Sequence, residues 1–128
     1  MDEINFEVKF YDKPDGEKPA KEFLENLEHK IRAKMLRLID LLEKNGNELR
    51  RPYSAHLDDG IFELRATVGS NTTRILYFFF IERQIILTHG FIKKTDEIPP
   101  AEITKAKNYR TEFLNREENN QWANLENF

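Results

Sequence analysis

The sequence contains no cysteine in its 128 residues, so disulfide bonds and metal sites built from thiolates are excluded. Long hydrophobic runs are also missing, and no stretch approaches the roughly 18 apolar residues that a membrane-spanning helix needs. The stretch MDEINFEVKF at the start is acidic and alternates in polarity, unlike the basic and then apolar start of a signal peptide. We therefore expect a cytoplasmic protein, and the length predicts one domain.

Residues for several kinds of chemistry are scarce. The sequence has 5 glycines, and none lies in a glycine-rich loop of the kind that holds a phosphate. Its 3 histidines, His29, His56 and His89, lack the spacing of metal ligands on one helix face. No serine lies in a nucleophile elbow. We expect neither a metal ion nor a cofactor.

Charge is unevenly distributed along the chain. The net charge is −3, but residues 29–94 carry a net +5 between acidic segments at 1–28 and 95–128. Two interpretations stay open: helix-surface charges that happen to segregate, or a basic surface that binds an anionic partner.

Apolar residues recur with helical spacing in two parts of the chain. Pro19 suits a first helical turn, and residues 19–45 are expected to form two helices, or one helix bent near Glu28. A double proline precedes a further helix that we expect over residues 101–116. Residues 117–128 are rich in Asn and Glu, which predicts a polar tail that is frayed or docks on a partner, outside a single domain at 1–116.

Strand patterns occupy the remaining segments. Residues 4–11 and 61–68 alternate in polarity, whereas 74–81 is apolar on both faces, which is typical of a central strand covered on each side. Residues 85–91 form the last expected strand, and 47–59 a polar connector. Short turns between the last three strands predict an antiparallel meander. The expected fold is α+β: a curved antiparallel sheet (an N-terminal strand plus the three-strand meander), with two N-terminal helices and a C-terminal helix packed mainly on one face.

Two arginines are expected to lie together on this sheet. Arg65 alternates with core residues and points to the other face, and Arg74 opens the next strand across a short turn. Two guanidiniums repel each other unless an anion lies between them, and arginine is well shaped for bidentate phosphate contact. The alternative is that Glu63 or another carboxylate pairs with each arginine in a purely structural role.

The segment after the last strand adds further candidates. His89 shares its parity with apolar residues of the strand, which makes a buried structural histidine a serious alternative to a catalytic one. Gly90 is expected to let the chain turn out of the sheet. Lys93 and Lys94 extend a cationic rim for phosphates, or are simply a solvated pair of charges.

Three more residues are candidates for contact with RNA. Phe78 and Phe80 share the parity of Arg74, so they offer an aromatic wall on which a base stacks, although most phenylalanines in such a strand are core. Arg37 falls on the wetter side of the second expected helix.

Three stretches, HLDDGIFELRA, TRILYFFF and ILTHGFIKKTDEIPPAEITKAKNYR, follow each other in this order. Together they resemble the HigB-like, phage-derived branch of the RelE/ParE superfamily of toxins, and the resemblance covers the chain from about Asn5 to Arg110. It implies a RelE-like fold and the toxin of a type II toxin–antitoxin system. Its partner would be a helix-turn-helix antitoxin, which also binds the operator DNA.

The same resemblance implies a ribosome-dependent mRNA endoribonuclease that needs no metal. A base takes the proton of a ribose 2′-OH, which attacks the adjacent phosphate. Arg65 and Arg74 match the arginines of the family's sheet and would stabilise the phosphorane. Lys93 and Lys94 match its lysines, for phosphate binding or proton transfer, and His89 matches its His-Gly-Phe segment.

Two other functions remain open at this point. A ParE-like protein would inhibit DNA gyrase by binding it and would cut no RNA. A phage-derived binding module would have lost its activity and kept its antitoxin. The negative net charge departs from the basic character usual for toxins that act on the ribosome.

Overall fold

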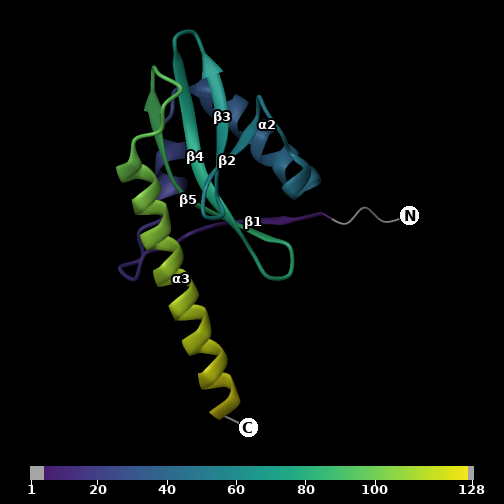
Figure 1. The fold of residues 1–128 in the computed structure, drawn as a ribbon, viewed down its shortest axis with the longest axis vertical. Coiled ribbons are helices and arrows are strands. Elements are labelled where there is room, and N and C mark those ends of the chain that lie inside the picture. The colour runs from purple at the N-terminus through teal and green to yellow at the C-terminus, as the bar shows by residue number, and fades with distance from the viewer. Residues whose placement is uncertain (1–4, 127–128) are drawn as a thin grey trace, which may run out of the picture.

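The computed structural model describes residues 5–126, which form an α+β fold (Figure 1). The α+β prediction is confirmed. In chain order the elements are β1 (Glu7–Phe10), α1 (Pro19–Glu25), α2 (His29–Asn45), a short 3-10 helix η1 (Gly46–Glu48), β2 (Ser54–Asp58), β3 (Ile61–Val68), β4 (Asn71–Phe80), β5 (Gln84–Lys93) and α3 (Pro100–Glu126).

The sheet has five strands in the order β1-β5-β4-β3-β2. The prediction of four antiparallel strands is wrong in two respects. Residues 54–58, expected within a polar connector, form an edge strand that pairs with β3. The N-terminal strand β1 pairs with β5 in parallel, with Glu7 opposite Gln84. The sheet is therefore mixed, and β2, β3, β4 and β5 are its antiparallel part.

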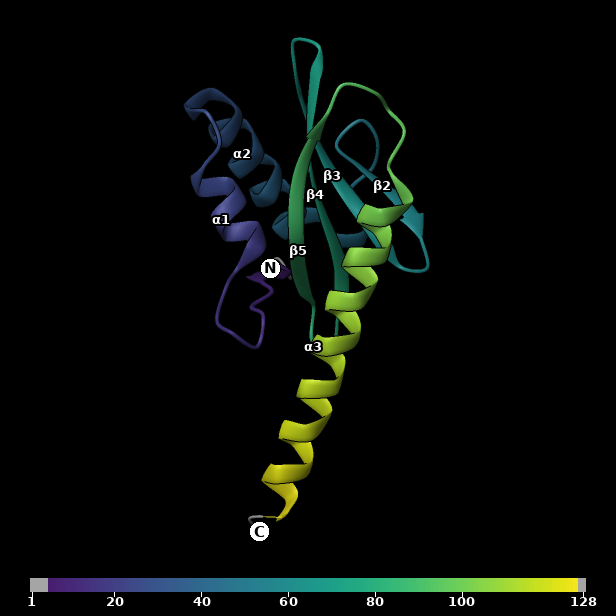
Figure 2. The ribbon, with the colours of Figure 1, turned by 90° about the vertical axis from the view of Figure 1, so that its left-hand side faces the viewer.

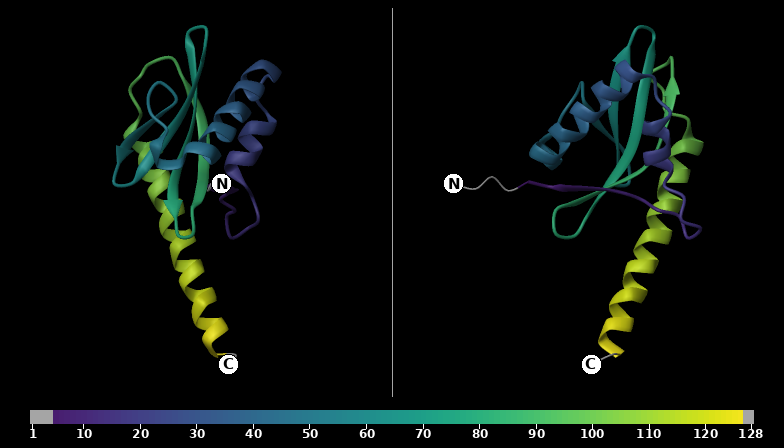
Figure 3. Two further views of the ribbon diagram at one scale, coloured as in Figure 1. Left: turned by 90° about the vertical axis from the view of Figure 1, so that its right-hand side faces the viewer. Right: turned by 180° about the vertical axis from the view of Figure 1, so that it is seen from behind.

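Helices α1 and α2 cover one face of the sheet (Figures 2 and 3). Their buried residues Leu24, Met35 and Leu42 pack with Leu64 and Tyr77 of the sheet. Pro19 is the first residue of α1. The helix is interrupted between Glu25 and His29, so the prediction of two helices at residues 19–45 is confirmed. The break brings α1 against β5 and α2 against β3.

Helix α3 lies on the opposite face, so the helices are not mainly on one side as expected (Figure 2). Its residues Ala106, Tyr109 and Phe113 pack against a second core that contains Leu76 and Phe78 of β4. The prediction of a central strand covered on both sides is therefore confirmed for β4.

The C-terminal helix is longer than its sequence pattern predicts. α3 continues beyond residue 116 to Glu126, through most of the expected tail, and its second half extends past the sheet (Figure 1). Trp122 and Leu125 are exposed there. Residues 127–128 of that expected tail lie outside the described residues. None of the helices at residues 5–126 combines the length and the apolar character that crossing a membrane requires.

Candidate functional site

Arg65 and Arg74 lie directly opposite each other on β3 and β4. The turn between the strands has two central residues, Gly69 and Ser70, because Val68 pairs with Asn71. Gly69 has a φ of 63°, which this kind of hairpin turn requires at its first central position and which glycine adopts without strain. This turn fixes the register, so the predicted juxtaposition of the two arginines is confirmed.

A buried carboxylate, that of Glu63, contacts both guanidiniums. Its Oε1 is 3.1 Å from Nε of Arg65, and its Oε2 is 3.3 Å from Nε of Arg74. Burial raises the pKa of Glu63, and the charges of Arg65 and Arg74 act against this rise. The ion pairs of the structural alternative are thus present. One carboxylate cannot neutralise two guanidiniums, however, so these three side chains carry a net positive charge when Glu63 is ionised.

The remaining contacts come from the loop between β5 and α3. Nη2 of Arg65 donates to Oδ1 of Asp96 at 2.8 Å, and Nη2 of Arg74 donates to the carbonyl of Thr95 at 2.8 Å. Glu63 and Arg74 are buried, with side-chain exposures of 4% and 0%, whereas Asp96 is 90% exposed. We call Glu63, Arg65 and Arg74 the arginine cluster. Its outer ligand, Asp96, lies in solvent.

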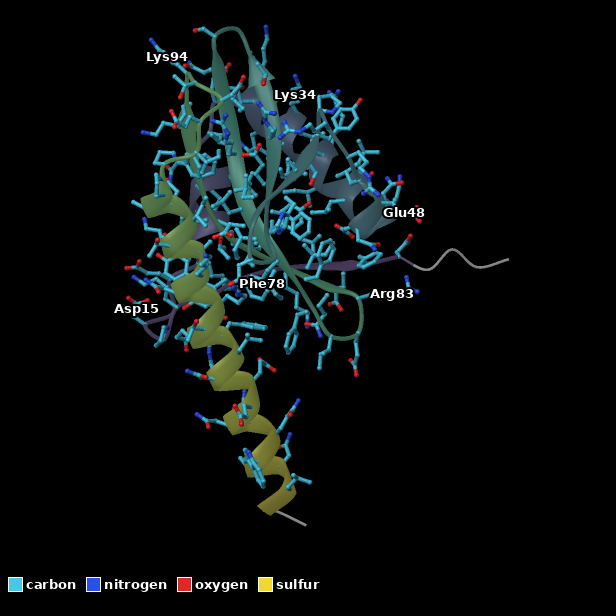
Figure 4. The ribbon with its side chains drawn as sticks, in the orientation of Figure 1. Asp15, Lys34, Glu48, Phe78, Arg83 and Lys94 are labelled. Carbon is cyan, nitrogen blue, oxygen red and sulfur yellow. The ribbon has the colours of Figure 1, made fainter. Side chains whose placement is uncertain are left out.

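The two predicted lysines lie near this cluster, at the end of the neighbouring strand β5 and at the start of the loop that follows it. Lys93 pairs with Thr72, two residues from Arg74 on β4, so its side chain is on the same face of the sheet as the arginines. Lys94 follows at the start of the loop, and both lysines are exposed. Figure 4 shows Lys94 at the same end of the molecule as Lys34 of α2, away from Phe78.

His89 does not face the side of the sheet that strand parity predicts. The register between β4 and β5 shifts, because Leu76 pairs with His89 and Tyr77 with Leu87. Thr88 is the extra residue of this bulge, and it moves His89 to the face covered by α3. His89 therefore shares a face with the arginines, contrary to the parity argument, but its side chain is only 5% exposed.

The surroundings of His89 are those of a structural residue. Its ring contacts the rings of Phe91 and Tyr109, and its Nδ1 lies 3.1 Å from Oγ1 of Thr88. Its Nε2 lies 3.7 Å from Oε1 of Glu102 on α3. Burial lowers the pKa of His89 to about 4, and the charge of Lys105 adds to this effect, so the ring is neutral at pH 7.

Gly90 does not turn the chain out of the sheet, because β5 continues to Lys93. A side chain at this position would instead collide with the ring of Phe23 on α1. Gly90 thus allows α1 to pack directly on the backbone of β5.

The structure places the three predicted RNA contacts away from the arginine cluster. Phe78 is 1% exposed and meets the ring of Phe113 at a centroid distance of 5.6 Å. Phe80 is half-buried and meets the same ring at 4.9 Å, so α3 covers part of this side chain, whereas a base can stack on Phe78 only if α3 moves. Arg37 is exposed on α2, in the layer on the other face of the sheet.

A hollow of about 110 Å³ lies beside Arg65, at the edge of β3 next to the residues that precede β2. Lys34, Tyr53 and Thr67 contribute to its lining, with Leu38 and Pro52. The Lys34 amine donates to the carbonyl of Thr67 at 2.6 Å, and Tyr53 is 45% exposed. Lys34, Tyr53 and Asp96 were not among the residues predicted for the site, and the local signal for Asp96 is an acid two residues after the lysine pair.

Within the described part of the chain, no group of three or more His, Asp or Glu side chains is arranged to hold a metal ion. The chemistry of the arginine cluster suits an anion: two fixed guanidiniums, an exposed loop carboxylate as their second counter-charge, and two exposed lysines nearby.

Fold and site together define a small α+β protein with a cationic cluster at one end of its sheet. The family model of the phage-derived protein Gp49-like family (DUF891) matches residues 22–111, more than two thirds of the chain. The protein belongs to this family, which is a RelE/HigB-like family associated with the toxins of toxin–antitoxin systems. The match includes every residue of the arginine cluster, Asp96 and both lysines. No curated protein matches the chain.

Proposed function

We propose that this protein is the toxin of a type II toxin–antitoxin system and acts as a ribosome-dependent mRNA endoribonuclease in the cytoplasm. One observation carries the proposal: two arginines in register on adjacent strands share a single buried carboxylate, and the second carboxylate that faces them, Asp96, is exposed in a loop beside two exposed lysines. Membership of a family of RelE/HigB-like toxins supports it.

The proposed reaction breaks the bond between phosphorus and the 5′-oxygen of the next nucleotide. A ribose 2′-OH gives up its proton to a base and attacks the adjacent phosphorus, and an acid protonates the departing 5′-oxygen. The products are a 2′,3′-cyclic phosphate and a 5′-hydroxyl end. The transition state carries more negative charge than the phosphodiester, so fixed cations accelerate the reaction.

The residues of the site have different parts in this proposal. Arg65 is the more accessible guanidinium and contacts the phosphate. The buried Arg74 adds a second positive charge below it, on the inner side of the cluster. Lys93 and Lys94 bind the RNA backbone and take part in proton transfer. His89 is a positioning residue, because its side chain is buried and its ring packs beside those of Phe91 and Tyr109.

The proposed protein partner is a helix-turn-helix antitoxin, and operator DNA is bound only through it. An antitoxin neutralises the toxin by covering or distorting the surface formed by Arg65, Lys93 and Lys94. We expect an adjacent reading frame that encodes a helix-turn-helix protein. Its product should copurify with this chain and restore growth when both are expressed together.

Induction of the chain in bacterial cells tests the activity. We expect growth arrest and new mRNA 5′ ends in phase with codons, detected by primer extension. The double variant Lys93→Ala/Lys94→Ala should lose both effects, and Lys18→Ala/Lys21→Ala is its matched control, because those lysines are exposed on and before α1. Arrest without new mRNA ends would contradict the proposal in favour of a gyrase inhibitor. No arrest at all would favour an inactive binding module.

A further inference from the structure

The arginine cluster has an outer ligand that belongs to the protein itself. Asp96 lies in the loop between β5 and α3, and its Oδ1 is 2.8 Å from Nη2 of Arg65 and 4.0 Å from Nη2 of Arg74. Its side chain is 90% exposed. The carboxylate therefore faces the arginine pair from the solvent side.

The two carboxylates of the site differ in how firmly they are held. Glu63 is 4% exposed, lies on β3 and contacts both guanidiniums from within the sheet, so it is held on a rigid element away from solvent. Asp96 lies in a loop, and within residues 5–126 its side-chain hydrogen bonds and ion pairs are only those to the two arginines. Exposed ion pairs contribute little to stability, so a competing anion can displace Asp96 easily.

A phosphodiester group resembles the Asp96 carboxylate in the features that arginine recognises. Both carry one negative charge and present two oxygens to the guanidinium fork. Nη1 of Arg74 is buried and, like Nε of both arginines and Oε2 of Glu63, has no hydrogen-bond partner among the described residues. The cluster therefore has a donor that the present contacts leave unused.

We propose that Asp96 is an exchangeable internal ligand of the arginine cluster, and that one phosphodiester group of single-stranded RNA binds by taking its place. This inference rests on the proposed function and adds to it a built-in competitor. The unbound site is neutral, because Glu63 and Asp96 together balance Arg65 and Arg74. RNA binding then requires that the loop after Lys94 moves Asp96 away.

The test is the affinity of the full chain for a short single-stranded RNA with 2′-O-methyl groups, which cannot be cleaved. Fluorescence anisotropy at fixed low salt gives the dissociation constant. Asp96→Asn and Asp96→Ala should each bind about threefold to fivefold more tightly than the wild type, as expected for loss of an exposed ion pair. Loss of folding cannot produce such a gain, and the exposure of Asp96 makes both variants compatible with the fold.

Asp15→Asn is the matched control, because Asp15 is also an exposed, ion-paired aspartate, 3.7 Å from Lys13, and its replacement changes the net charge equally. It should bind RNA like the wild type. If the Asp96 variants bind no more tightly than Asp15→Asn while Arg65→Ala loses binding, the exchange is wrong and the proposed function stands. If Arg65→Ala binds like the wild type, or if no protein binds, the proposed site fails together with the exchange.

Discussion

Arg74 is a charged side chain in the interior of the protein, and its replacement by methionine tests how the arginine cluster is held. The guanidinium is fully buried, lies 3.3 Å from Glu63 and donates to the carbonyl of Thr95. Removing one partner of a buried ion pair costs about 3–5 kcal/mol, because the other charge is left without compensation. Glu63 keeps its contact with Arg65 at 3.1 Å, so we expect the lower end, about 3 kcal/mol.

Urea unfolding followed by circular dichroism measures this loss as a lower transition midpoint with an unchanged slope. The double variant Glu63→Gln/Arg74→Met is the informative comparison. It leaves no uncompensated carboxylate in the interior, so it should recover about 1–2 kcal/mol relative to Arg74→Met alone. A loss below about 1 kcal/mol for Arg74→Met, or additive losses in the double variant, would refute the buried pairing described here.

Two further predictions concern stability. Burial lowers the pKa of His89 from 6.5 to about 4. Between pH 6.5 and about 4, therefore, the imidazole takes up a proton in the unfolded chain but not in the folded one. The free energy of unfolding falls by up to about 3 kcal/mol as the pH drops through this range. Urea titrations across this pH range should show a smaller loss in the free energy of unfolding for His89→Gln than for the wild type. The exposed control His56→Gln should lose as much as the wild type. Equal losses in the wild type and both variants would contradict this prediction. Gly90→Ala forces the new methyl group into the ring of Phe23 and should lower the free energy of unfolding by about 1–3 kcal/mol, measured in urea. Phe23→Leu in the Gly90→Ala background should restore part of that loss, and a Gly90→Ala variant as stable as the wild type would show that α1 does not pack closely on β5.

The sequence was most informative where local rules determine the structure. The short turn at Gly69-Ser70 implies the register of β3 and β4, and that register places Arg65 opposite Arg74. The break near Glu28 and the doubly covered strand β4 also follow from local patterns, because apolar spacing shows which faces are buried.

Strand pairing over long distances could not be predicted in the same way. The parallel pairing of β1 with β5 joins residues about 77 positions apart, such as Glu7 and Gln84, and no turn between them encodes it. The bulge at Thr88 inverts the parity of the strand at His89, because one extra residue moves a side chain to the other face.

The ligands of the arginine cluster illustrate the same limit. Glu63 was open to prediction as a partner, since it shares the face of Arg65 and lies two residues away on one strand. Asp96 is 31 residues from Arg65, in a loop without periodicity, so only the tertiary structure brings it to the cluster. The second half of α3 lacks an apolar stripe, which is why its helix was not predicted beyond residue 116.

We propose above that the surface formed by Arg65, Lys93 and Lys94 cleaves mRNA on the ribosome. The most direct measurement is cleavage of a defined mRNA on purified ribosomes, with analysis of the new ends. We expect codon-phased fragments with 5′-hydroxyl and 2′,3′-cyclic phosphate ends for the wild type and the Lys18→Ala/Lys21→Ala control, and a loss of at least about tenfold in rate for Lys93→Ala/Lys94→Ala. Intact mRNA with the wild type, or equal cleavage by all three proteins, would contradict it.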